Sequence, residues 1–393
     1  MSADVTTVRE LVPADVLAEV QQTIGNMSGI IEVATTCNLA CKYCFAKRPT
    51  PAIMSTDTAR KIIESLLRYN GPGAETKFIW HGGEPLLAGI PFYKNILQIQ
   101  SELASEGLKY RNSIQTNGTL LNDEWIDFFR DNSFGVGSSL DGLRNLHDAK
   151  RRDRKNTGTY DTVVGNLLRA KERGLTIGTI CVISRETLPY VEDIYHNMKA
   201  LGLPFTMSPV TPNYGQPNDL QPLTPVEYTD VLIRLFDIWF DDPKPTITVN
   251  PPHSVLTGII YGGMPLYCSA DDSCFSKFVS FLPDGSVYPC NRFAGDQGFY
   301  LGNINDTAFD AILDNSPRRK LMERTKETLT PCSSCESNSM CRGGCAHHAF
   351  TFYGDIMNPD YYCKAFFTAF NHYRERLNAA LSKAESKREG VCS

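Results

Sequence analysis

The sequence predicts an α/β protein in which an open, partial (β/α)6 barrel is followed by a small cysteine-rich region. Between residues 30 and 242, six apolar strand segments alternate with amphipathic helix segments. A loop with three cysteines follows the first strand, and eight more cysteines crowd between residues 268 and 363. Strand–helix alternation of this kind builds a parallel sheet covered by helices, with right-handed crossovers.

The six units follow from apolar periodicity and from turn residues along the chain. The expected strands span residues 30–35, 77–80, 110–116, 134–140, 175–183 and 204–210. The expected helices span about 57–70, 91–106, 122–131, 160–173, 188–201 and 224–241, with Asn122 as an N-cap. Six units suggest an incomplete TIM-like barrel. In such barrels the chemistry gathers at the C-terminal ends of the strands.

The remaining segments are assigned around this barrel. Residues 1–29 are expected to form a helical lead-in, 30–242 the barrel and 243–265 a linker. Residues 266–365 form the cysteine-rich domain, and 366–393 a C-terminal helix and tail. Within the cysteine-rich domain, alternating apolar residues around Asp284-Gly285 predict a β-hairpin, which would bring Cys290 beside Cys274 and Cys268.

Composition narrows the class of protein. The net charge of −5 argues against binding driven by the phosphates of a nucleic acid. No segment approaches about 18 uninterrupted apolar residues, so a membrane span is not expected. The N-terminus resembles no secretory signal. Without export, the 13 cysteines indicate a cytoplasmic protein whose thiols bind metal rather than form disulfides.

The loop that follows the first strand carries Cys37, Cys41 and Cys44, spaced three and then two residues apart. Iron–sulfur clusters of the [4Fe–4S] type are held by cysteine thiolates, normally four. A loop that offers three leaves one iron open to a substrate or cofactor. Zinc is the alternative, but no fourth Cys or His lies nearby in the sequence.

This C-x3-C-x2-C loop resembles the signature of radical S-adenosylmethionine (SAM) enzymes, with Tyr43 and Phe45 flanking its third cysteine. The resemblance extends to His81-Gly-Gly-Glu-Pro85 after the second strand. It implies that Gly82, Gly83 and Glu84 hold the SAM amino group and that Tyr43 and Phe45 flank the adenine. It also implies contacts to the ribose and carboxylate from Asn117, Ser138, Ser139 and Arg151, with Arg152 as the rival of Arg151. Asn117 is as readily a turn former, and Asp141 a loop cap.

The later cysteines resemble the SPASM domain, an extension of radical SAM enzymes that holds two auxiliary [4Fe–4S] clusters. The resemblance assigns Cys268, Cys274, Cys290 and Cys345 to the first auxiliary cluster, and Cys332, Cys335, Cys341 and Cys363 to the second. Together with the barrel loop this implies three clusters, although zinc held by four cysteines has similar spacing. Cys181 is expected in the core and Cys392 in a charged tail. His347 and His348 are expected to be structural or to support the cluster ligands without binding metal themselves.

The resemblance also implies the chemistry. The open iron binds the amino and carboxylate groups of SAM, and one electron releases methionine and a 5′-deoxyadenosyl radical that takes a hydrogen atom from the substrate. The auxiliary clusters would accept the electron left on the substrate radical or pass electrons along. An electron donor such as flavodoxin or ferredoxin is the implied partner.

The substrate is expected to be a ribosomally made precursor peptide or a protein. Anaerobic sulfatase-maturating enzymes, which form formylglycine, typically carry an Asp base directly after the hairpin cysteine, whereas this chain has Asn291. An amide is no carboxylate base. We therefore favour a peptide maturase that forms a C–C, thioether or ether crosslink, with sulfatase maturation as the alternative.

Three further expectations accompany that preference. A non-catalytic electron-transfer or zinc-binding interaction protein is the alternative from another class. Any leader peptide is expected to be recognised by a separate protein or by the barrel surface, because the N-terminal segment is short. Asp284, Asp296 and Asp355 are candidate bases by position, and each is also a plausible turn residue.

Overall fold

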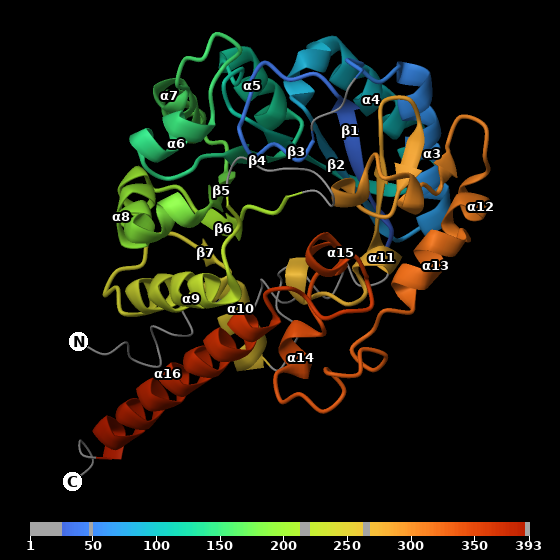
Figure 1. Cartoon of the computed structure of the whole chain (residues 1–393). Coiled ribbons are helices and arrows are strands. Elements are labelled where there is room, and N and C mark those ends of the chain that lie inside the picture. The colour runs from blue at the N-terminus through green and yellow to red at the C-terminus, as the bar shows by residue number, and fades with distance from the viewer. Residues whose placement is uncertain (1–25, 47–49, 213–220, 262–267, 390–393) are drawn as a thin grey trace.

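The computed structural model describes residues 26–46, 50–212, 221–261 and 268–389 (Figure 1). Its strands form one sheet in the order β10-β9-β8-β1-β2-β3-β4-β5-β6-β7. Neighbouring strands are parallel from β8 across β1 to β7. The barrel strands are β1 (Ser28–Ala34), β2 (Glu75–Gly82), β3 (Lys109–Thr116), β4 (Gly135–Ser139), β5 (Ile177–Ile183), β6 (Phe205–Pro209) and β7 (Val249–Asn250). The predicted α/β class is confirmed, and the six expected strands all form.

The helices that connect these strands lie around the outside of the curved sheet (Figure 1). They are α3 (Thr56–Asn70), α4 (Gly89–Ala104), α5 (Asp123–Asp131), α7 (Tyr160–Glu172), α8 (Val191–Leu201) and α9 (Pro225–Phe240). Local sequence sets their ends. Asn122 caps α5 by accepting a hydrogen bond from Trp125 N, as predicted, and Thr224 and Glu227 form a capping box on α9.

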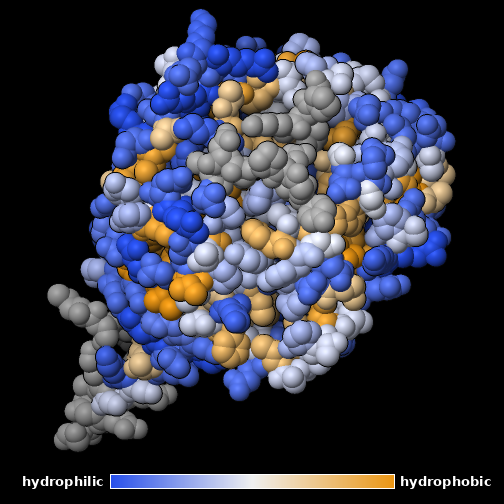
Figure 2. Space-filling model, in the orientation of Figure 1, coloured by the Kyte–Doolittle hydropathy of each residue, from blue (hydrophilic) through white to orange (hydrophobic). Residues whose placement is uncertain are grey.

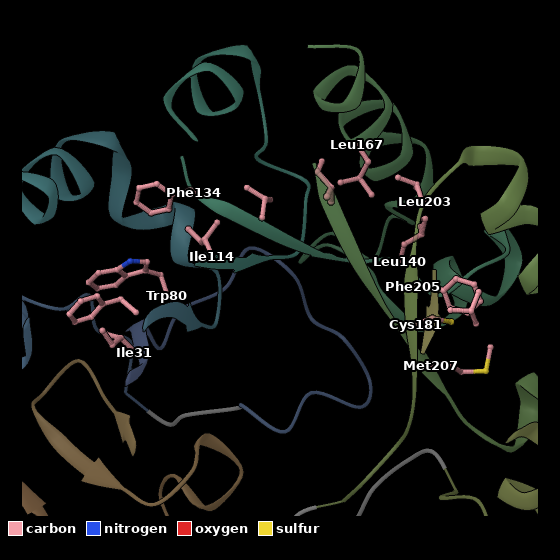
Figure 3. Packing of buried hydrophobic residues seen from close by; sticks show 14 of the residues in the cluster. Ile31, Trp80, Ile114, Phe134, Leu140, Leu167, Cys181, Leu203, Phe205 and Met207 are labelled. Atoms are coloured by element: carbon pink, nitrogen blue, oxygen red, sulfur yellow. The ribbon is translucent and has the colours of Figure 1, made fainter. Parts of the chain in front are cut away.

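The core fills the space between the sheet and these helices (Figure 3). Trp80 on β2 is fully buried, and its indole N–H donates to Asn112 at 2.9 Å. Cys181 on β5 is also fully buried and belongs to the same apolar cluster as Leu140 and Phe205. This agrees with the expected core position of Cys181, because a free thiol behaves as a small hydrophobe.

The predicted hairpin is present, and it joins the barrel sheet. β8 (Phe278–Phe281) pairs with β9 (Ser286–Tyr288) around Gly285, whose φ of +88° suits a residue without a side chain. β8 also pairs in parallel with β1, and β10 (Gly302–Asn303) extends the hairpin. The cysteine-rich region is thereby fixed beside the strand from which the cysteine loop begins.

The segment expected to be a linker carries regular structure. It contributes β7 to the sheet edge and the helix α10 (Pro252–Tyr261). Another helix not expected from the sequence, α6 (Arg144–Lys150), follows β4. The cysteine-rich region carries the short helices α11 (Cys274–Lys277), α12 (Phe309–Leu313), α13 (Ser316–Met322), α14 (Asn338–Cys341) and α15 (Ala346–Tyr353).

The last helix, α16 (Cys363–Glu389), lies along α9 and projects beyond it (Figure 1). The Tyr373 ring stacks on Phe236 at 4.0 Å, and its hydroxyl donates to Leu232 O at 2.8 Å. The expected N-terminal helix and Cys392 lie outside the described residues.

The surface in Figure 2 is mostly hydrophilic, with apolar residues scattered between polar ones. Among the described residues, no helix is long and apolar enough to cross a membrane.

Candidate active site

The cysteine loop lies at the C-terminal end of β1 and is held by backbone hydrogen bonds to the end of α6 and the segment that follows it. Ala40 N donates to Arg152 O at 2.8 Å, and Lys42 N donates to Lys150 O at 3.0 Å. The Arg154 side chain donates to Cys37 O at 2.8 Å. The segment that was expected to bind SAM therefore also fixes the loop.

The three thiols of this loop are half-buried neighbours. Burial raises the pKa of Cys41 to about 12, and the nearby thiols of Cys44 and Cys37 add to the rise. Burial likewise raises the pKa of Cys37 to about 11. Bound iron would lower these pKa values again, because the metal's charge deprotonates a coordinating thiol. Three adjacent thiols with no fourth protein donor among the residues described around them fit a cluster with one open corner.

Gly82 and Gly83 are required by the backbone of the cysteine loop. A Cβ on Gly82 would lie 2.4 Å from Ala34 O, and one on Gly83 would lie 2.2 Å from Thr36 O. Gly83 N donates to Ala34 O at 2.6 Å. The two glycines were expected to let the backbone approach SAM closely. In this structure they let the end of β2 approach the end of β1.

Glu84 is fully buried, and protein groups occupy its carboxylate. It accepts hydrogen bonds from Leu86 N (3.0 Å), Thr116 Oγ1 (2.7 Å) and Asn117 N (2.8 Å). Burial raises the pKa of Glu84 to about 7, and these donors oppose the rise. Glu84 thus ties the ends of β2 and β3 together. Any contact with the SAM amino group would have to share this carboxylate.

Asn117 contacts the cysteine loop. Its amide donates to Asn38 Oδ1 at 2.9 Å and points at Cys37 Sγ at 3.7 Å, while its oxygen accepts from Thr119. Ser138 Oγ is buried and has no hydrogen-bond partner among the described residues, whereas Ser139 is half-buried. An unpartnered buried hydroxyl at the end of β4 fits the polar ligand that the sequence predicts there.

Tyr43, Asp141 and Arg151 form a buried cluster beside the cysteine loop. The Tyr43 hydroxyl donates to Asp141 at 2.5 Å, and Arg151 Nε lies 3.1 Å from the same carboxylate. Burial alone would raise the pKa of Asp141, but the Arg151 guanidinium holds it below its usual range. Arg151, expected to bind the SAM carboxylate, is here paired with Asp141. The rival Arg152 donates to Asp148 O and Asn156 instead.

The eight later thiols gather in the two groups that the sequence predicts. Burial raises the pKa of Cys274 well above its ordinary value, and the thiols of Cys268, Cys290 and Cys345 add to this. In the other group, burial raises the pKa of Cys363 to about 11, with contributions from Cys332 and Cys335. Cys341 joins this second group, because its pKa is raised by burial and by the thiols of Cys363 and Cys335.

Among the described residues, no three His, Cys, Asp or Glu side chains surround a point suited to a single metal ion. A cluster binds each thiolate to a different iron, so its ligands need not converge on one point.

Arg324 lies between the two thiol groups and supports their assignment to anionic clusters. It is 2% exposed, and its guanidinium donates to four backbone carbonyls, those of Gly343, Gly344, Ile356 and Asn358, at 2.6–3.0 Å. Burial lowers the pKa of Arg324, whereas thiolates of both groups and Asp360 raise it. A buried guanidinium that is bound only by neutral carbonyls needs a nearby negative charge, and an anionic cluster would supply it.

The two adjacent histidines differ in their contacts. His348 Nδ1 lies 2.9 Å from Asp360 and its Nε2 lies 3.2 Å from Thr211 Oγ1, just after β6. Burial lowers the pKa of His347 well below its ordinary value. Asp360 also accepts from Cys345 N at 2.8 Å. The His348 ring thus joins α15 to Asp360 and to the segment that follows β6.

The three candidate bases are turn residues in this structure. Asp284 accepts from Ser286 N, Asp296 from Gly298 N and Asp355 from Met357 N, each at 2.8–2.9 Å. Asp284 and Asp355 are exposed. Nothing in their surroundings distinguishes them as bases.

Sequence reasoning missed Arg292 and Arg324. The Arg292 guanidinium lies 4.1 Å from the centre of the Phe45 ring, so Phe45 contacts the cysteine-rich region as well as the loop. Arg324 belongs to no local pattern, whereas Arg292 stands in the stretch Tyr288-Pro-Cys-Asn-Arg-Phe-Ala-Gly295, which resembles peptide-crosslinking maturases but did not reveal this contact. The only signal in the sequence is the position of Arg292 two residues after a predicted ligand cysteine.

The fold and the thiol groups define an iron–sulfur protein built on a partial α/β barrel. The radical SAM superfamily model matches residues 31–198, and the model of an iron–sulfur cluster-binding domain, SPASM, matches residues 274–336. The chain is a radical SAM enzyme with a SPASM domain, and it binds SAM and [4Fe–4S] clusters.

The chain is similar to named enzymes and to solved structures. The cysteine-type anaerobic sulfatase-maturating enzyme of Clostridium perfringens (strain 13 / Type A) is 28% identical over 364 residues, which cover 89% of this chain and 97% of that protein. The solved structure of native anSMEcpe with bound AdoMet and Cp18Cys peptide has a TM-score of 0.79 and 26% identity, covering 90% of this chain and 99% of that one. Streptococcus suis SuiB bound to precursor peptide SuiA shares the fold, at a TM-score of 0.63, 15% identity and coverage of 90% and 79%.

Proposed function

We propose that this chain oxidises a Cys or Ser side chain of a peptide or protein substrate to formylglycine. The observation that carries the proposal is the match, over 97% of its length, to a cysteine-type anaerobic sulfatase-maturating enzyme. The related structure with a bound peptide adds support for a peptide substrate. These relatives favour formylglycine formation over the crosslinking activity that the sequence favoured.

Peptide crosslinking is the second candidate, and Asn291 favours it. The Cys290 thiol lies 3.4 Å from Asn291 Oδ1, so this amide faces a predicted cluster ligand. Formylglycine formation removes a proton from the substrate thiol or hydroxyl, and an amide has no basic site for that proton.

We assign this chain's residues to three [4Fe–4S] clusters in the sets described above. The bound cofactor supplies a 5′-deoxyadenosyl radical, which takes a hydrogen atom from the substrate. The protein positions cofactor and substrate and excludes water. In this proposal Ser138 and Ser139 contact SAM, and Arg151 is freed from Asp141 or shared with it when the SAM carboxylate binds. An external electron donor such as flavodoxin or ferredoxin completes the system.

The test uses protein reconstituted anaerobically with iron and sulfide, then incubated with SAM and a chemical reductant. Peptides that carry Cys, Ser or Ala at one position are compared by mass spectrometry. Formylglycine formation predicts 5′-deoxyadenosine together with an aldehyde that hydroxylamine traps, in the Cys or Ser peptide but not in the Ala peptide. A product that lacks two hydrogens and carries no aldehyde would favour the second candidate. SAM cleavage that leaves every peptide unchanged would refute both.

A further inference from the structure

Arg292 lies where the cysteine-rich region meets the cysteine loop of the barrel. It follows Cys290 and Asn291 at the end of the hairpin, in the short turn η4 (Asn291–Phe293). Its guanidinium is 4.1 Å from the centre of the Phe45 ring, and Phe45 directly follows Cys44. One arginine therefore bridges the predicted SAM-cluster loop and the first auxiliary thiol group.

The Arg292 side chain is half-buried. A guanidinium carries five N–H donors in its plane, and a ring stacked on its face uses none of them. Among the described residues, no oxygen lies within hydrogen-bond or ion-pair distance of these donors. A half-buried cation with five open donors is suited to an anionic group that enters from outside the chain.

The carboxylates of this region already have partners. Asp271 pairs with Lys277 at 2.8 Å, and Asp272 pairs with Arg342 at 3.2 Å. Asp360 is held by His348 and by backbone N–H groups. None of these three carboxylates is left to neutralise Arg292, and no ion pair joins Arg292 to another acidic side chain of the described residues.

We infer that Arg292 binds a carboxylate of the peptide substrate and is a specificity-determining residue. This inference rests on the proposed peptide substrate. Planar guanidinium and carboxylate groups form two parallel hydrogen bonds, which fix orientation as well as affinity. Bound there, a carboxylate would hold the peptide between the cysteine loop and the first auxiliary thiols. The carboxylate is an Asp or Glu side chain or the peptide's C-terminus.

A purely electrostatic role for Arg292 predicts different behaviour. Its charge favours the thiolates of Cys290 and Cys268, whose pKa values burial raises to about 11 and about 12. If Arg292 served only to offset cluster charge, its removal would shift the reduction potential of an auxiliary cluster and change kcat for every substrate. It would not change the preference among substrates.

The experiment compares matched peptides on the reconstituted holoprotein with SAM. Each peptide carries one Cys, with Asp or Asn at a single neighbouring position. A second set ends in a free carboxylate or an amide. The variants are Arg292→Gln and Arg292→Lys, with Arg319→Gln as control, because Arg319 is exposed and its side chain pairs with Asp314. Iron content and peptide-independent SAM cleavage report whether each variant is folded and loaded.

In the wild type, one carboxylate peptide should have a lower KM than its amide partner, by roughly 10- to 100-fold for charged hydrogen bonds. Arg292→Gln should abolish that difference at similar kcat, Arg292→Lys should keep part of it, and Arg319→Gln should keep all of it. The Asp/Asn set and the free-terminus set identify which carboxylate binds.

An equal KM ratio in wild type and Arg292→Gln, with or without a shifted cluster potential, overturns the inference while the proposed function stands. Failure of the wild type to modify any peptide overturns both.

Discussion

Replacing Arg324 by Met should release the auxiliary clusters while sparing the cluster of the barrel loop. Arg324 makes four hydrogen bonds to backbone carbonyls that are buried beside the thiol groups. Two acceptors lie between Cys341 and Cys345, and two lie shortly before Cys363. The side chain therefore sets the spacing between ligands of both groups.

The loss in free energy of unfolding follows from the number of hydrogen bonds that the substitution removes. Four bonds at about 1–1.5 kcal/mol each amount to about 4–6 kcal/mol, because Met leaves the carbonyls without donors. A whole domain is stable by only about 5–15 kcal/mol, so this loss would unfold much of the cysteine-rich region. The stability of Arg324→Lys should lie between those of the wild type and Arg324→Met, since an ammonium cannot reach four carbonyls at once.

The assay measures iron per chain and thermal unfolding after anaerobic reconstitution. Arg324→Met should lose the auxiliary iron and unfold at a lower temperature. The control is Arg319→Met, whose exposed side chain contacts Asp314. Unchanged iron content and an unchanged melting temperature in Arg324→Met would show that this arginine does not organise the thiol groups.

Three further predictions follow. Glu84 has a folded pKa of about 7 against an ordinary 4.5, so its contribution to stability is full below about pH 4.5 and is lost as pH rises through about 7. SAM-free protein should lose up to about 3 kcal/mol from this group between pH ~5 and ~8 in denaturant titrations, and a slope retained in Glu84→Gln would contradict the assignment. Replacing Cys37, Cys41 and Cys44 by Ala should abolish SAM cleavage but keep roughly two thirds of the iron, since each of the three proposed [4Fe–4S] clusters holds four irons and the two auxiliary clusters would remain; loss of all iron would argue against independent clusters. Asn291→Asp should raise formylglycine yield by roughly 10²-fold if a missing base limits that reaction, and an unchanged yield would mean that the proton leaves through another group.

Much of the fold could be predicted because its signals are local. The six strands appear within two residues of their expected positions, and Asn122 caps its helix as predicted. β7, α10 and α6 were not expected, because each is a short element without a clear apolar period. Their formation depends on the sheet edge and on the loop against which they pack.

The sequence predicted the cysteine ligands of the candidate site better than the hydrogen-bond partners of its polar side chains. The resemblance to the SPASM domain predicted the two thiol groups that the fold brings together. The expected partners of Glu84 and Arg151 were atoms of SAM, and Asn117 was expected to bind SAM or to form a turn. Each of these side chains is held by other parts of the protein, and Asn117 also accepts from Thr119 N within its own turn. Polar residues at strand ends serve to join neighbouring strands as often as to bind a ligand, and a single sequence does not distinguish these uses.

The amino-acid sequence by itself determined the class of fold and the family. Periodicity and spacing act over a few residues, so they can be recognised without knowing what lies nearby. The pairing of β8 with β1, the contact of Arg292 with Phe45 and the four carbonyls around Arg324 were decided by the tertiary structure. Each of these contacts joins segments that are far apart in the sequence, and it forms only after the sheet and the cysteine-rich region have packed together.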